Sequence, residues 1–203
     1  MPRLTALVFL ATLALSLTGR PAEAAVYWDK VSILKSFFAN SERVTFKRLV
    51  PTPDQVALLR QRLGYAPPRE VTVYFGMTRD RIDGLAVIDN ELGQHLPITF
   101  GALVGTEGAL KRLEVMVYRE AYGEEVREPR FRQQFQGKTA LDPLKPGRDI
   151  VAVAGATISS KSMATGSKRA LVLIDELVLR PGLARVLLPV KVAATPDKPA
   201  AHL

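Results

Sequence analysis

The feature that most constrains this chain is a turn at residues 154–160, with the sequence AGATISS. It follows a short apolar run at residues 150–153, typical of a buried strand, and it opens a long helical pattern. Strand, glycine turn and helix in this order bring unpaired backbone N–H groups to one point, where the helix dipole attracts anions such as phosphate. The alternative, which these residues alone favour, is that Thr157 or Ser159 only caps the helix.

The alternation of apolar and polar residues predicts a sheet made of neighbouring strands joined by short turns. The candidate strands are residues 71–76, 84–88, 98–104 and 110–118. Because consecutive strands with such short connections pair as hairpins, the sheet is expected to be mostly antiparallel. Residues 41–50 are short and mixed in character, and no element is predicted there.

Helical spacing predicts two N-terminal helices and one long C-terminal helix. The predicted helices are residues 26–38, 53–63 and 158–179. The second has clear ends, because Thr52 and Pro53 form a typical start and Gly64 a typical stop. The fold class is therefore α+β, a mostly antiparallel sheet flanked by N-terminal helices and a long C-terminal helix.

The first 24 residues have the pattern of a secretory signal peptide. Arg3 supplies the positive start, residues 4–17 are apolar, and Ala22 and Ala24 form a small-x-small cleavage site. We therefore expect a periplasmic protein that begins near Ala25. An uncleaved anchor, which would leave the protein membrane-associated, is the alternative.

Three further segments follow the predicted signal peptide. Residues 25–69 form an N-terminal helical segment, residues 70–192 the main domain, and residues 193–203 a tail rich in Pro, Ala and Lys that we predict to be disordered. Within the main domain, residues 183–192 are apolar and are predicted to be a last strand or an amphipathic partner-binding segment.

Composition argues against several classes of function. The chain has no cysteine and only two histidines, which excludes cysteine-held iron–sulfur clusters and argues against haem, zinc or any other metal site. Its net charge is +8, but the basic residues are spread along the chain without a DNA-binding motif, so nucleic acid is not an expected partner. No Ser/His/Asp or paired-carboxylate pattern indicates hydrolysis, and no catalytic residue is predicted.

The segment Gly155-Ala156-Thr157-Ile158-Ser159 resembles the flavin-attachment motif of the FMN-binding domain family. That family includes the flavin-carrying subunits of the sodium-translocating quinone reductase and of the Rnf complex. In it, a separate flavin transferase esterifies the threonine hydroxyl to the phosphate of FMN. The resemblance implies FMN as cofactor, attached at Thr157, with Ser160 and the other motif residues around it.

A second segment supports the resemblance. After the strand at 110–118 comes a charged loop with Glu120, Tyr122 and Gly123, and later Gly137-Lys138. On composition alone this is a solvated loop followed by packed aromatic residues. Many family members have a Glu-x-x-Gly loop and a Gly-Lys pair in this order, upstream of the Gly-Ala-Thr motif. The resemblance, which covers residues 71–178, implies that Glu120 and Tyr122 touch the flavin ring, that Gly123 allows close backbone approach, and that Lys138 belongs to the site.

Two positions depart from the family pattern. Members usually carry an aspartate six residues before the threonine, where this chain has Val151, and its nearest acid is Asp149. The residue before Gly155 is often Ser or Thr and here is Ala154. If the transferase reads the aspartate, the alternatives to a covalent bond at Thr157 are a loosely bound flavin and an unmodified protein.

Two hypotheses for function follow. The first is an exported electron-carrying flavoprotein, rather than a stand-alone catalyst, which holds FMN through Thr157. It would be matured by a flavin transferase and would pass electrons between a membrane-bound reductase and periplasmic partners such as a cytochrome. The second is a non-redox periplasmic binding or sensing module of the same fold without covalent flavin. Two further side chains have alternative roles. Trp28 either packs in the core, which we favour, or stacks on the flavin. His95 either has a surface or hydrogen-bonding role, which we favour, or transfers protons to the reduced flavin.

Overall fold

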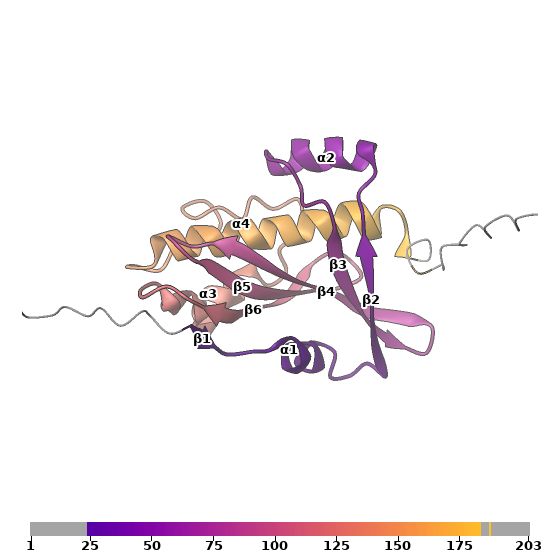
Figure 1. The fold of residues 1–203 in the computed structure, drawn as a ribbon, viewed down its shortest axis with the longest axis horizontal. Helices are drawn as coiled ribbons and strands as arrows, with labels where there is room; N and C mark the ends of the chain where they lie inside the picture. Colours follow the sequence, from indigo (N-terminus) through magenta and orange to yellow (C-terminus); the bar gives the residue numbers. More distant parts are fainter. Residues whose placement is uncertain (1–23, 184–186, 188–203) are drawn as a thin grey trace, which may run out of the picture.

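The computed structural model describes residues 24–183 and residue 187. Their centre is a six-stranded antiparallel sheet with the strand order β1-β6-β5-β4-β3-β2 (Figure 1). The strands are β1 (Ala25–Val26), β2 (Arg43–Leu49), β3 (Val71–Thr78), β4 (Arg81–Leu92), β5 (Pro97–Val104) and β6 (Leu110–Tyr118). The predicted α+β class and the mostly antiparallel sheet are confirmed.

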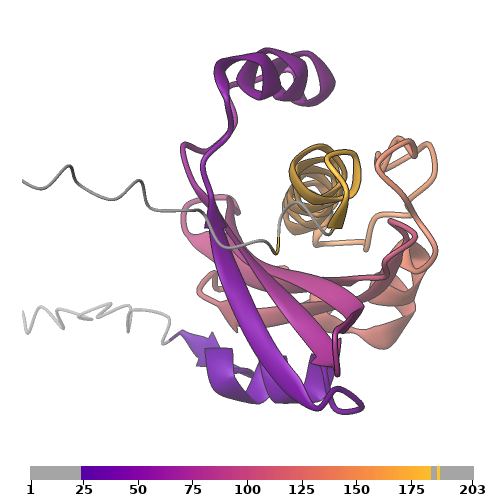
Figure 2. The same cartoon turned by 90° about the vertical axis from the view of Figure 1, so that its right-hand side faces the viewer.

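Helices cover both faces of this sheet, as Figure 2 shows. On one face α1 (Lys30–Phe37) packs through Ile33 and Phe37, which form a small buried cluster with Tyr74 of β3. On the other face lies the long helix α4 (Thr157–Ile174), and the main hydrophobic core fills the space between it and the sheet. Successive side chains of a strand point to opposite faces, so one strand contributes to both clusters.

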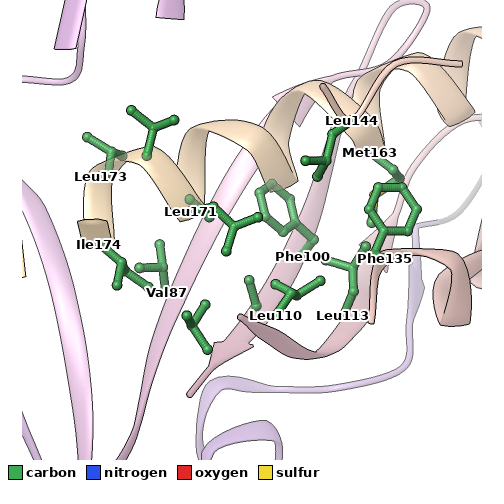
Figure 3. Close-up of a cluster of buried hydrophobic side chains, with 14 of the residues drawn as sticks. Val87, Phe100, Leu110, Leu113, Phe135, Leu144, Met163, Leu171, Leu173 and Ile174 are labelled. Carbon is green, nitrogen blue, oxygen red and sulfur yellow. The ribbon is translucent and has the colours of Figure 1, made fainter. Parts of the chain in front are cut away.

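The main core contains large side chains from the sheet, from α4 and from the segment between them (Figure 3). Phe100 of β5 lies beneath α4 beside Leu171. A Cβ atom at Gly166 would stand 2.6 Å from the ring of Phe100, so α4 can approach the sheet this closely only with glycine there. Gly166 therefore allows close contact between α4 and β5.

The N-terminal segment differs from the predicted pattern. The helix expected at 26–38 begins later, because the Asp29 side chain accepts a hydrogen bond from the Ser32 N–H at 2.8 Å and caps α1 there. The residues before it form β1, which pairs with β6. Residues 43–49, where no element was predicted, form the edge strand β2. An edge strand that is exposed on both faces lacks the alternation on which sequence-based prediction relies.

The next helix, α2 (Pro53–Leu63), has the ends that were predicted. Thr52 caps it in a capping box with Gln55, and Gly64 ends it with a φ of +82°. The helix stands beyond the edge of the sheet in Figure 1 and reaches the far end of α4 through its residue Arg62.

Between β6 and α4 the chain forms η1 (Glu124–Arg127), α3 (Pro129–Arg132) and η2 (Gln133–Phe135). After α4 it continues as the π-helical turn η3 (Asp175–Leu179), so the helical path runs to the predicted end. No helix among the described residues is long and apolar enough to cross a membrane. The predicted signal peptide, the disordered tail and nearly all of the segment 183–192 lie outside the described residues.

Candidate functional site

Thr157 is the first residue of α4, and its side chain is exposed. The chain reaches it through a tight turn in which the Ala156 N–H donates to the Val153 carbonyl at 3.0 Å. Gly155 has a φ of +79°, a conformation that favours glycine. The Thr157 hydroxyl makes no hydrogen bond to any of the described residues.

The first turn of α4 also leaves backbone donors free. The N-cap residue is Ala156, whose methyl group cannot accept a hydrogen bond. The expectation that Thr157 or Ser159 caps the helix is therefore wrong. The first helical bond runs from the Ser160 N–H to the Ala156 carbonyl at 2.8 Å. The N–H groups of Thr157, Ile158 and Ser159 have no acceptor within the described part of the chain, as expected for an uncapped helix start.

The two serines of the motif use their hydroxyls inside the protein. Ser159 Oγ lies 2.8 Å from the Tyr118 hydroxyl, and Ser160 Oγ accepts from the Val153 N–H at 3.1 Å. Both residues are buried. The structure thus places them beneath the turn, where they hold it against β6, while Thr157 remains the exposed hydroxyl of the motif.

The loop after β6 lies directly against this helix start. Besides contacting Ser159, the Tyr118 hydroxyl donates to the Tyr122 carbonyl at 2.5 Å. Gly123 has a φ of +95°, and a Cβ atom there would stand 2.5 Å from Ser159 Oγ. Burial raises the pKa of Tyr118 although the Ser159 hydroxyl acts in the other direction. The structure therefore brings the two motifs together.

Glu120 braces the neighbouring hairpin between β4 and β5. One carboxylate oxygen accepts from the backbone N–H groups of His95 at 2.5 Å and of Leu96 at 2.8 Å. Partial burial acts to raise the pKa of Glu120, but these two donors outweigh it and the pKa is lowered. The side chain of Tyr122, by contrast, is 87% exposed. Glu120 thus faces the hairpin and Tyr122 faces solvent.

Lys138 lies in an ion pair within a different loop. Its Nζ is 3.0 Å from Asp149 Oδ2, and the Asp149 carboxylate also accepts from the backbone of Leu144 and Lys145. Burial opposes ionisation of Asp149, yet the Lys145 N–H and the Lys138 ammonium lower its pKa. The positive charge of Lys138 is therefore balanced by a carboxylate.

A hollow that sequence analysis did not identify adjoins the turn. It has a volume of about 420 Å³ and is lined by Arg130, Phe131, Gln134 and residues 151–154. Gln134 accepts from the Val151 N–H at 2.7 Å and donates to its carbonyl at 3.2 Å, as a neighbouring strand would. No local pattern marks a glutamine that pairs with backbone 17 residues later, so only the structure reveals its role.

Comparison with known proteins identifies the family. A sequence model of the FMN-binding domain family matches residues 64–172, more than half of the chain. The chain belongs to this family. FMN is therefore its cofactor, as the two motifs predicted.

The two other comparisons add one distant structural match. The crystal structure of NqrC from Shewanella oneidensis matches with a TM-score of 0.38 and 18% identity, over 62% of this chain and 62% of that one. This chain thus spans under two thirds of the length of that relative. No curated protein sequence matches this chain.

The free groups at the start of α4 fit the phosphate of FMN. An exposed hydroxyl, three backbone donors without partners among residues 24–183, and the positive end of the helix dipole meet at Thr157. Lys161 lies one helical turn further on, exposed and without an ion-pair partner in the described part of the chain. These groups favour an anion, and the FMN phosphate is one.

The structure also shows the contacts of Trp28 and His95, for which the sequence left two roles each. Trp28 packs against the small cluster on the α1 face, with the Arg112 guanidinium 5.6 Å from its ring centroid, so the favoured packing role is confirmed. His95 meets Glu120 through its backbone N–H. Among the described residues, no group of three or more His, Cys, Asp or Glu could hold a metal ion.

Proposed function

We propose that this protein is an electron-carrying flavoprotein that holds FMN through a phosphoester on Thr157. The observation that carries the proposal is the contrast among the motif hydroxyls. Those of Ser159 and Ser160 are buried and hydrogen-bonded inside the protein, whereas that of Thr157 is exposed and bonds to none of the residues that the structure describes. A transferase can reach only an exposed hydroxyl.

The position of Thr157 suits a negatively charged ester. A phosphodiester on its Oγ would lie beside the unpaired N–H groups of the first turn, and charge at a helix N-terminus is worth ~0.3–1 kcal/mol. Lys161 adds positive charge one turn further along. The isoalloxazine ring supplies the redox chemistry when bound, and the protein supplies attachment, charge and orientation.

The hollow before the turn would hold part of the ring system. Its lining offers the aliphatic residues 151–154 and the exposed Arg130 side chain, whereas Phe131, which also lines it, is buried. Because the Gln134 side chain is hydrogen-bonded to both the N–H and the carbonyl of Val151, this side of the hollow is held in place. Such a combination of apolar surface and few polar groups is typical of cofactor sites.

The departure at Val151 removes a carboxylate from an exposed position. Its side chain is 74% exposed, so the family aspartate would be accessible at this position. Asp149 does not replace it, because Lys138 and two backbone N–H groups engage its carboxylate. This observation favours the second candidate function, a binding or sensing module without covalent flavin.

Export and partners belong to the proposal as well. The pattern of residues 1–24 supports a periplasmic location, and the absence of cysteine suits an oxidising compartment. A covalent bond would keep a cofactor that could not be replaced outside the cytoplasm. The net charge of +8 would steer acidic redox partners, such as a cytochrome or a membrane-bound reductase, toward the protein.

The test is the intact mass of the exported protein, produced together with a flavin transferase. The wild type and Thr157→Ser, which keeps the hydroxyl, are expected to gain one FMN minus water, and Thr157→Ala to gain nothing. A colourless wild type without added mass would contradict the carrier and favour the sensing module. A yellow wild type that loses its flavin on denaturation would contradict the ester alone.

A further inference from the structure

We propose that the end of the molecule around the start of α4 docks on the surface of a lipid bilayer. An apolar rim surrounds this end, formed by Leu92, Leu96, Tyr122 and Ile158, whose exposed fractions are 60%, 43%, 87% and 49%. Exposed apolar side chains that gather at one place mark contact surfaces. The inference goes beyond the proposed function and does not depend on the ester at Thr157.

Hydrogen bonds place Leu92 and Ile158 side by side. The Ser162 hydroxyl donates to the Leu92 carbonyl at 2.6 Å and contacts the Ile158 carbonyl at 3.1 Å. Since one oxygen atom reaches both carbonyls, the end of β4 and the first turn of α4 are in direct contact. Their exposed side chains therefore belong to one surface.

The other two members of the apolar rim join this surface through the loop after β6. Glu120 accepts from the Leu96 N–H, and Tyr122, two residues further on, is held through its carbonyl by Tyr118. Tyr118 in turn contacts Ser159 of α4. The hairpin, the loop and the helix start thus converge at one end of the molecule, which Figure 1 shows at the left.

The N-terminal segment that leads into the domain favours a lipid bilayer as the partner of this surface. Residues 1–23 precede the fold, include the apolar run at 4–17, and join it at β1. In β1, Ala25 pairs with Tyr118 and the exposed Val26 pairs with Val117. While the predicted signal peptide is still attached, or if it stays as an uncleaved anchor, its apolar run therefore joins the domain at the end that bears the apolar rim.

Charge and area favour a bilayer over a protein. A net charge of +8 attracts anionic headgroups and disfavours a second copy of the same chain. Four partly exposed side chains offer much less than the ~800 Å² that each partner contributes to a stable protein interface. Tyr122, with an apolar ring and a polar hydroxyl, is a residue type enriched at the membrane–water boundary.

Vesicles of phosphatidylglycerol and phosphatidylethanolamine test the proposal with the exported protein. The variant Leu96→Ser/Tyr122→Ser keeps the backbone hydrogen bonds of both residues and is expected to weaken co-sedimentation about tenfold. The control is Val44→Ser/Phe46→Ser, which removes two exposed apolar side chains (43% and 56%) from β2, at the edge of the sheet opposite β1. The control is expected to bind as the wild type does.

Hydrogen exchange separates docking of the apolar rim from tethering by the N-terminal segment. Vesicles are expected to slow exchange in residues 92–97 and 119–123 but not in β2, and Thr157→Ala without flavin should behave the same way. Equal binding of the rim variant and the control would overturn the proposal. So would protection of these segments by attached flavin or by a second copy of the chain in the absence of vesicles.

Discussion

The two ends of α4 contrast in what their polar groups contact. At the C-terminal end, Arg62 of α2 lies 2.6 Å from Asp175 and 2.7 Å from Glu176, and Arg180 lies 3.2 Å from both. At the N-terminal end, three backbone donors and the Thr157 hydroxyl meet no partner in the described part of the protein. One end ties the fold together, and the other is left open for a ligand.

The largest expected effect lies at the closed end. Glu176→Ala removes a carboxylate that is 5% exposed and pairs with Arg62. Because the partly buried Arg62 then keeps only one acidic partner, we expect the free energy of unfolding to fall by about 3 kcal/mol. Urea denaturation measures this loss. Flavin attachment in the remaining folded protein should be unchanged, and a loss of attachment would contradict the division between the two ends.

Gly123→Ala tests how closely the loop after β6 must approach the open end. A methyl group would meet Ser159 Oγ and the Tyr118 hydroxyl in a backbone conformation of positive φ, so we expect a loss of about 2 kcal/mol. Thermal unfolding and the intact mass after exposure to flavin transferase provide the measurements. Gly137→Ala is the control, because it has a positive φ but no atom near the added Cβ. Equal losses in both variants would mean that backbone strain, not contact with α4, is responsible.

Gln134→Ala should make the backbone at Val151, which lines the hollow next to the turn, less rigid. It removes both side-chain bonds to Val151 and is expected to cost about 1 kcal/mol and to slow flavin attachment. The rate is followed by the gain in mass with time. The exposed neighbour Gln136→Ala should leave the rate unchanged. If both glutamine variants react at the wild-type rate, the hollow does not position the turn.

The smallest effect concerns pH and Glu120. Its pKa is lower in the folded protein, so its contribution to stability is present above the unfolded pKa of about 4.3 and is lost as the pH falls through the folded value. The midpoint temperature of Glu120→Gln should therefore lie below that of the wild type at neutral pH and converge with it in acid. A constant difference across this range would show that the carboxylate charge does not brace the hairpin.

Local signals predicted a large part of the fold. Thr52, Gln55 and Gly64 act within one helix, and β3 to β6 are runs rich in apolar residues joined by short turns, so sequence alone was sufficient. Strands β1 and β2 were missed because one has two residues and the other is exposed at the edge.

The sequence by itself determined the family, the cofactor and the position of Thr157 at the start of a helix, because a glycine turn before a helix is a local property. Only the tertiary structure decided which hydroxyl of the motif is free. Ser159 is engaged by Tyr118, 41 residues away, and Ser160 by the turn itself. Partners so distant in sequence meet only when the sheet and α4 pack together, and that packing leaves Thr157 facing outward.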